Sequence, residues 1–145
     1  MIKKIKLIIT FFLCLNFINL SYAENNFYEQ GKKKFIEKEY EDSKFLFQRS
    51  IVFDPKDINS YLYLAKIFNI EENKKEEEKN LKTTLLIDPA NEEAILMLME
   101  IALEKTNYTK VKELSERFTK VCKNLCSENK KILQDLKNLE PKNES

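Results

Sequence analysis

Two short stretches decide the fold of this sequence: Gln48–Pro55 (QRSIVFDP) and Lys82–Pro89 (KTTLLIDP). Each runs through apolar residues at helical spacing and ends in an Asp-Pro pair, and the two pairs are 34 residues apart. Proline cannot continue a helix, so each pair marks a helix end. A fixed spacing of this length is the signature of a chain built from stacked helical repeats. We therefore predict an all-α fold.

The composition supports helices and excludes several classes of function. The 145 residues include one glycine, three prolines, no histidine and no tryptophan, and 34% of them are charged. Sheets need frequent turn residues that this chain lacks. Glycine-rich phosphate loops, histidine general bases and histidine metal sites are likewise excluded. The formal net charge of +1 gives no indication of nucleic acid binding. We expect no cofactor, no metal, no catalytic residue and no nucleic acid partner.

The 34-residue units resemble the tetratricopeptide repeat (TPR) family. In that family aromatic and small residues recur at set places in two helices, and the matching positions are predicted to pack the repeats. They are Phe27, Gly31, Tyr40, Ser43, Phe47, Ser50 and Pro55 in residues 24–57, and Tyr61, Leu64, Ala65, Phe68, Leu81, Thr84 and Pro89 in residues 58–91. Glu77 departs from the pattern by replacing a small residue. A third unit, 92–125, is degenerate, since Met99, Ser115 and Phe118 do not fit and no proline closes it.

The resemblance implies a right-handed α-solenoid of about three antiparallel helix pairs. Helices are predicted at 26–38, 41–53, 58–70, 74–87, 92–105 and 108–122, with Asp57 and Asn91 as N-caps. A capping helix is predicted within 126–140, starting behind Ser127 as its N-cap, and it would cover the open end of the stack. Residues 141–145 are expected to form a disordered tail.

The first 23 residues are predicted to be a signal peptide. Lys3, Lys4 and Lys6 precede a short apolar run over residues 7–20, and Ser21-Tyr22-Ala23 gives a cleavage site after Ala23. An uncleaved anchor and a lipid anchor on Cys14 are the alternatives. Cleavage would remove three lysines and no acid, so 22 basic and 24 acidic groups would remain, a net charge of −2. We expect an exported protein, periplasmic or secreted, with no stable membrane anchor after cleavage.

The resemblance also implies a partner-binding groove along the first helix of each repeat. Lys32 and Lys66 lie one period apart in this set, and they could receive an acidic group of a peptide while neighbouring apolar residues hold its side chains. The alternative is that both lysines are solvated surface charges. The groove positions are Tyr28, Lys32, Phe35, Asn59, Leu62, Lys66, Asn69, Glu93, Leu96, Glu100 and Leu103.

Cys122 and Cys126 are separated by three residues, which is not the CxxC spacing of redox enzymes. In an exported protein we predict that they form a structural disulfide, which would fix the turn into the last helix. Reduced thiols and a catalytic or intermolecular role are the alternatives. The charged run over residues 71–79 is interpreted as a solvated turn and helix start.

Three functions follow as hypotheses. The first is a non-enzymatic, exported TPR module that binds a peptide or partner protein of the cell envelope in its concave groove. The second is a structural or assembly factor that acts by self-association, as a homo-oligomer. The third, a thiol-disulfide enzyme, is disfavoured by the cysteine spacing and by the lack of a βαβ pattern.

Overall fold

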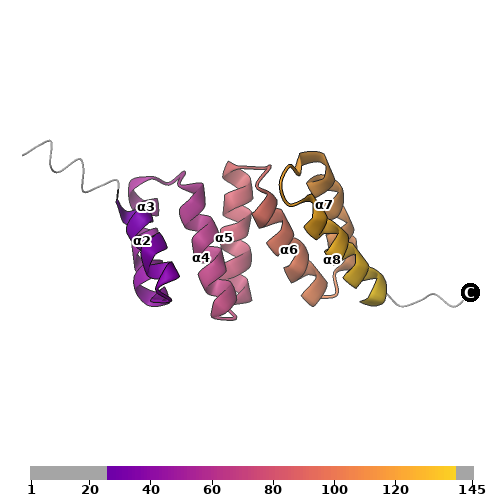
Figure 1. The fold of residues 1–145 in the computed structure, drawn as a ribbon, viewed down its shortest axis with the longest axis horizontal. Coiled ribbons are helices and arrows are strands. Elements are labelled where there is room, and N and C mark those ends of the chain that lie inside the picture. The colour runs from indigo at the N-terminus through magenta and orange to yellow at the C-terminus, as the bar shows by residue number, and fades with distance from the viewer. Residues whose placement is uncertain (1–25, 140–145) are drawn as a thin grey trace, which may run out of the picture. The chain divides into compact units, whose positions relative to one another are not determined.

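A computed structural model describes residues 26–139, and this part of the chain consists of helices and turns without a β-strand. The helices are α2 (Phe27–Ile36), α3 (Tyr40–Phe53), α4 (Ile58–Ile70), α5 (Lys74–Ile87), α6 (Glu92–Glu104), α7 (Tyr108–Val121) and α8 (Cys126–Leu139), as Figure 1 shows. All seven predicted helices are confirmed to within two residues at each end. The predicted signal peptide and tail lie outside the described residues. None of the helices described here has the length and apolar character needed to cross a membrane.

The helices divide into two units, the first ending at Ser60 and the second beginning at Tyr61. In the first unit, α2 and α3 form an antiparallel hairpin, and Gly31 is buried between the two helices. A Cβ atom at Gly31 would lie 2.9 Å from Cε1 of the buried Phe47 ring, so the approach of the two helices requires glycine. Ser43 on α3 donates a hydrogen bond of 2.8 Å to the Gly31 carbonyl. Gly31 and Ser43 thus lie at the contact between α2 and α3.

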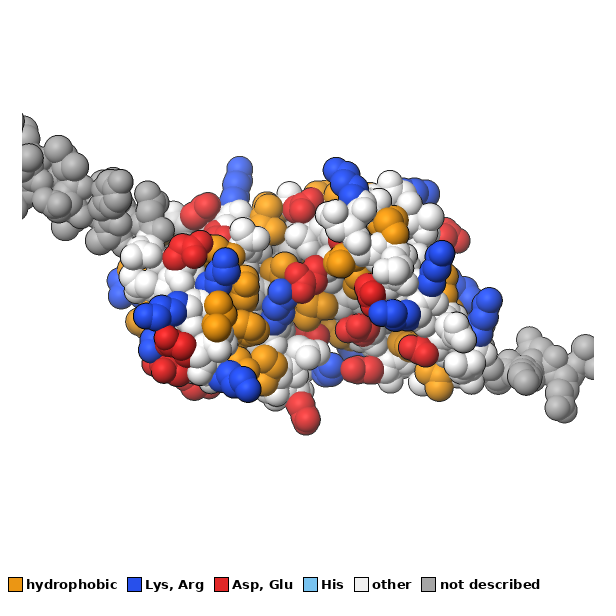
Figure 2. Space-filling view, in the orientation of Figure 1, with side chains coloured by type: hydrophobic (Ala, Val, Ile, Leu, Met, Phe, Trp, Pro, Cys, Tyr) orange, Lys and Arg blue, Asp and Glu red, His pale blue; other side chains and the backbone are white. Residues whose placement is uncertain are grey.

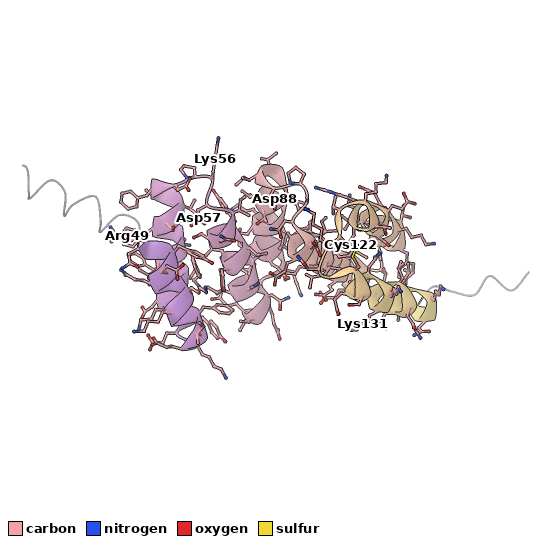
Figure 3. The ribbon with its side chains drawn as sticks, turned by 45° about the horizontal axis from the view of Figure 1, so that its top comes forward. Arg49, Lys56, Asp57, Asp88, Cys122 and Lys131 are labelled. Carbon is pink, nitrogen blue, oxygen red and sulfur yellow. A yellow bond between two sulfur atoms is a disulfide. The ribbon has the colours of Figure 1, made fainter. Side chains whose placement is uncertain are left out.

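An aromatic layer covers one end of the same hairpin. The rings of Phe27 and Phe53 stack with their centroids 5.4 Å apart. Arg49, labelled in Figure 3, lies with its guanidinium 4.5 Å from the Phe27 ring centroid and 5.7 Å from that of Phe45. Cation–π contact of this kind orients the arginine against the apolar surface.

The second unit holds a continuous hydrophobic core. Leu81 and Leu85 of α5 belong to one buried cluster with apolar residues of α6 and with Val111, Leu114 and Phe118 of α7. Ile132 and Leu136 of α8 complete the cluster, so the predicted capping helix covers the α6–α7 pair. Met99 and Phe118, the departures from the repeat pattern, are fully buried here. Both side chains belong to the cluster that Ile132 and Leu136 of α8 complete.

Each helix pair turns at a residue with a left-handed backbone. Lys38, Glu72 and Thr106 have φ angles of 62°, 57° and 54°, and they are spaced by 34 residues. The amide of the next residue then bonds back to a carbonyl five positions earlier: Glu39 to Lys34, Asn73 to Phe68 and Asn107 to Ala102. This is the Schellman motif, which usually contains glycine at the left-handed position. The backbone therefore repeats three times, even where the sequence pattern weakens.

The turns between repeats are fixed by acidic and amide side chains. Asp54 and Asp88 accept from the amides of Lys56 and Ala90, at 2.9 Å and 3.0 Å. The predicted N-caps are confirmed: Asp57 accepts from the Ser60 amide at 3.1 Å, and Asn91 accepts from the Ala94 amide at 3.0 Å. Figure 3 labels Asp57 and Asp88 in these turns. Pro55 and Pro89 are exposed, so they end helices and do not pack the repeats as predicted.

Candidate functional site

In the first unit, the predicted groove residues of α2 form one row. Tyr28, Lys32 and Phe35 are half-buried and lie at i, i+4 and i+7, which places them on the same face of the helix. The Tyr28 ring lies 6.0 Å from that of Phe47, and the Phe35 ring lies 5.6 Å from that of Tyr40 in an edge-on arrangement. The two aromatic rings thus contact α3 and remain partly exposed. Asn59, at the start of α4, is exposed.

In the second unit, the predicted groove lysine is already paired. Lys66 on α4 lies 2.8 Å from the Glu93 carboxylate on α6, and its ammonium is 4.8 Å from the centroid of the Tyr63 ring. A carboxylate of a ligand would have to displace Glu93 from this lysine. The pair instead joins α4 and α6 along the face that the groove residues were predicted to line.

The structure corrects the prediction for the apolar groove residues of this unit. Leu62 and Leu96 are each 7% exposed and belong to the hydrophobic core. Leu103 is half-buried against the same core. The buried surface of Leu62 and Leu96 leaves little area on these side chains for a ligand to contact.

A buried carboxylate lies below this face. Glu77 on α5 is only 1% exposed, although the charged run that contains it was interpreted as solvated. It accepts a hydrogen bond of 2.8 Å from Asn69, and its other oxygen lies 3.3 Å from the Lys74 ammonium. Lys74 also lies 3.0 Å from Glu104 at the end of α6. Burial becomes tolerable because the charge has these partners.

Glu77, Glu100 and Glu104 together form what we call the acidic patch. The pKa of Glu100 is raised above its ordinary value, first because the surrounding protein removes water from this carboxyl and then because Glu77 and Glu104 repel its charge. Desolvation also lowers the pKa of Lys74, but its hydrogen bonds and charge interactions with Glu104 and Glu77 outweigh this effect and leave it raised. Three carboxylates facing one lysine leave an excess of negative charge that can receive a cationic group.

Sequence reasoning identified Asn69 and Glu100 but missed Glu77, Lys74 and Glu104. The available signal was the departure of Glu77 from the small residue that the repeat pattern expects at its position. A buried acidic side chain needs hydrogen-bond or ion-pair partners nearby. For Glu77 these are Asn69, which donates a hydrogen bond, and Lys74, which forms an ion pair.

The two cysteines lie in the turn that precedes α8. Cys122 and Cys126 are joined by a disulfide with their Cα atoms 5.4 Å apart, and Figure 3 labels Cys122 at this turn. Cys122 occupies the place that Asp54 and Asp88 hold in the earlier repeats. Because α8 begins at Cys126, Ser127 lies inside its first turn and is not the N-cap that was predicted.

Glu92 holds the same turn from the start of α6. Its carboxylate accepts from the amides of Lys123, Asn124 and Leu125 at 2.8 Å, 3.0 Å and 2.7 Å. The hydrogen bond from the Leu125 amide lowers the pKa of Glu92 most. Desolvation opposes it, but the amides of Lys123 and Asn124 add to the lowering and leave the pKa below its ordinary value. The bond and this carboxylate together fix the turn, which indicates a structural role for the cysteines.

The face drawn in Figure 2 carries mixed charge. Basic and acidic side chains are interspersed over it, with hydrophobic side chains between them. Within residues 26–139 no three Cys, Asp or Glu side chains are grouped so as to hold a metal ion.

Comparison with known proteins identifies the fold but not a family. No protein-family model matches the sequence, and a search of curated proteins gives no significant match. Among solved structures, the chain resembles the type III secretion chaperone SycD of Yersinia enterocolitica in complex with a peptide of the translocator YopD. The TM-score is 0.68 at 15% identity, covering 78% of this chain and 88% of SycD.

Two further solved structures have the same fold. The TPR domain of Sgt2 from Aspergillus fumigatus gives a TM-score of 0.67 at 13% identity, covering 85% of this chain and 87% of that domain. The first TPR domain of human RPAP3 gives 0.66 at 16% identity, covering 79% and 93%. The predicted all-α, helix-pair repeat fold with a capping helix is therefore confirmed.

Proposed function

We propose that this chain is a non-enzymatic, exported TPR-like module that binds a segment of another protein of the cell envelope. The observation that carries the proposal is the acidic patch on the α4–α6 face of the second unit. Glu100 is exposed there above the buried Glu77, and its raised pKa marks a carboxylate whose charge is poorly compensated. A positively charged side chain of a partner would relieve this repulsion.

The charges on this face favour a basic over an acidic ligand. Lys66 is neutralised by Glu93, and Lys74 is shared between Glu77 and Glu104. Counting these groups with Glu100 gives two positive and four negative charges, a net of −2. We therefore infer that the bound segment places a lysine or arginine near Glu100.

The similar structures support peptide binding as a use of this fold. SycD was solved with a peptide of YopD, and the first TPR domain of RPAP3 was solved with the HSP90 peptide SRMEEVD. Their sequence identity to this chain is 15% and 16%, so the likeness shows a shared fold only. The chemistry of the ligand is therefore inferred from the charged residues of this chain.

Photocrosslinking in intact cells tests the proposal. A photoreactive amino acid at Asn69, beside the acidic patch, should crosslink to one partner segment that contains a basic residue, identified by mass spectrometry. Glu100→Lys should then weaken binding of the purified segment by about tenfold or more, corresponding to about 1.4 kcal/mol. Glu116→Lys, on the exposed surface of α7, is the control that should leave binding unchanged. Equal affinity of both variants would contradict the proposed site.

Export has its own support and its own test. The basic residues, the apolar run and the Ser21-Tyr22-Ala23 site all precede the first described helix. Mass spectrometry of the mature protein from the cell envelope should give an N-terminus at Glu24. A chain that retains residues 1–23, or that is recovered only from the cytosol, would overturn this part of the proposal.

A second candidate function is self-association through α3. Phe45, Val52 and Phe53 are large apolar side chains that remain exposed on this helix, Val52 with 76% of its surface. Such a patch favours an interface. Sedimentation at high concentration should show a dimer that Val52→Glu dissolves, and a strictly monomeric profile would remove this candidate.

A further inference from the structure

The second unit has a cleft on a different side of α6 from the acidic patch, and none of the α6 groove residues lines it. Around the helix, Leu98, Ile101 and Lys105 lie about 80–160° from Glu93 and Glu100, given about 100° per residue. The cleft has a volume of about 360 Å³ between α5, α6 and α7. The candidate groove residues of α6 therefore contribute nothing to it, and whatever occupies the cleft binds independently of the groove.

The floor of the cleft is apolar and its rim is positive. Leu85, Leu98, Ile101, Ala102 and Leu114 form the floor and belong to the hydrophobic core. The charged lining residues are Lys82, Lys105, Lys110, Arg117 and Glu78, four cations against one carboxylate.

The cations of the rim are held in place around the opening. Lys82 and Lys105, from α5 and the end of α6, both pair with Glu78. Their hydrogen bonds lower the pKa of Glu78, that of Lys105 most, so this carboxylate stays charged and fixes both lysines. Lys110 pairs with Glu113 at 2.7 Å, and Arg117 donates to the Pro89 carbonyl at 2.6 Å. Even with Glu113 included, the rim keeps an excess of positive charge.

Leu86 adds an exposed apolar side chain to the edge of this cleft, outside the hydrophobic core. Its side chain is 83% exposed at the end of α5, although it lies next to the buried Leu85. A solvent-exposed leucine beside an apolar cleft offers area that becomes buried only when another molecule covers it.

We infer that this cleft is a second docking site, which receives an acidic amphipathic helix of a partner protein. Two helices flanking a third form the kind of groove into which a helix lays its apolar face, with anchors at i, i+3 or i+4 and i+7. Carboxylates on the borders of that face would meet Lys82, Lys105, Lys110 and Arg117. A small molecule fits less well, because such sites orient their ligand with polar groups inside the pocket, and here the charges lie on the rim.

The inference is tested with a synthetic helical peptide of about four turns, with leucine at the anchor positions and glutamate on both borders. Binding to the full mature chain is followed by fluorescence anisotropy, and the site by methyl NMR. The peptide should saturate the protein and shift the methyl signals of Leu86, Ile101 and Leu114. A matched peptide with lysine in place of glutamate should bind at least about tenfold more weakly.

Two surface variants test whether the peptide binds in the cleft, and neither replaces a core residue. Leu86→Glu and Lys110→Glu should each weaken the acidic peptide by about tenfold, while Ile70→Glu and Lys131→Glu, exposed positions outside the cleft, should leave it unchanged. Glu100→Lys separates this inference from the proposed function, since it changes the groove and should not weaken this peptide. No saturable binding, equal binding of the lysine peptide, or sedimentation showing that Leu86→Glu dissolves a dimer would overturn the inference.

Discussion

The ring of Phe47 lies where a side chain of residue 31 would begin. A Cβ atom on Gly31 would come within 2.9 Å of Cε1 and 3.0 Å of Cδ1 of that ring, which is fully buried and has no room to move. Glycine at this helical position is therefore required by contact between α2 and α3, since a glycine inside a helix otherwise costs stability.

Gly31→Ala is expected to destabilise the protein. Overpacking of a filled core typically costs about 1–3 kcal/mol, and the better helix propensity of alanine returns only about 1 kcal/mol. Urea denaturation followed by far-UV circular dichroism should show a net loss of about 1 kcal/mol or more. Gln30→Ala, an exposed neighbour, should stay within about 0.5 kcal/mol of the wild type. Gly31→Ala combined with Phe47→Leu tests the cause, since the smaller side chain should make the added methyl group nearly neutral.

Thr106→Gly is expected to stabilise the protein, in contrast to Gly31→Ala. Thr106 is held at a φ of 54°, where residues other than glycine pay about 1–2 kcal/mol. Glycine removes that strain but gives the unfolded chain more freedom, so the net gain should be about 0.5–1 kcal/mol. Thr109→Gly, inside α7, is the matched control and should lose stability. A Thr106→Gly variant that is no more stable than wild type would show that this turn is not strained.

The left-handed turns show what the sequence could and could not predict. The helix bounds and the Asp57 and Asn91 caps follow from local rules that hold wherever the residues occur, whereas the packing role of Gly31 came from its matched position in the repeat pattern. Lys38, Glu72 and Thr106 share a conformation but no side-chain chemistry, so no residue pattern could align them. Their equivalence is a property of the backbone turn that joins the two helices of each pair.

The candidate site could be predicted from the sequence only in part. The family resemblance assigned Lys66, Asn69 and Glu100 to one groove. A matched position in a repeat does not say how far a side chain is buried, so Leu62 and Leu96 were assigned to the groove although they belong to the core. It also does not show partners on other helices, and the pairing of Lys66 with Glu93 changes which ligand charge this face favours.

Glu92 should make the turn before α8 sensitive to pH. Its folded-state pKa is lowered by the amides that it accepts, so its contribution is complete at neutral pH and is lost as the pH falls through that lowered pKa. In Glu92→Gln the amide protons of residues 123–125 should exchange faster at pH 7. The difference from wild type should shrink on acidification. Glu116→Gln on α7 serves as the control and should leave these amides unchanged at either pH.

Reduction of the disulfide should loosen the last helix without unfolding the chain. Cys122 and Cys126 close a loop of only a few residues, for which the loop-entropy model gives about 2 kcal/mol. Urea denaturation with and without a thiol reductant should show that reduction lowers the free energy of unfolding by that amount or less. Hydrogen exchange should show that the amides with faster exchange lie in α8. A Cys122→Ser, Cys126→Ser variant should match the reduced wild type and be indifferent to the reductant. Global unfolding on reduction would mean that α8 covers more of the core than its contacts indicate.

Glu100 links the acidic patch to both stability and ligand binding. Its folded-state pKa is raised, so its charge costs the folded protein stability at neutral pH, and the cost disappears once the pH falls below the ordinary glutamate pKa. Glu100→Gln should therefore be more stable at pH 7, by about 0.5 kcal/mol for a carboxyl this exposed, and equal to wild type near pH 3. Desolvation raises this pKa most, the charges of Glu77, Glu104 and Glu128 raise it further, and Lys74 opposes the rise. Glu104→Gln should therefore give part of the same gain in stability.

The same carboxyl should respond to the proposed basic ligand. A lysine or arginine beside Glu100 favours its charged form, so binding should release protons and strengthen as the pH rises from acid to neutral. Calorimetry of the crosslinked partner segment in buffers of different ionisation enthalpy measures this release directly. Glu100→Gln should abolish most of it, and raised salt should weaken binding to the wild type more than to the variant. Proton uptake instead of release would mean that the ligand brings negative charge to this face.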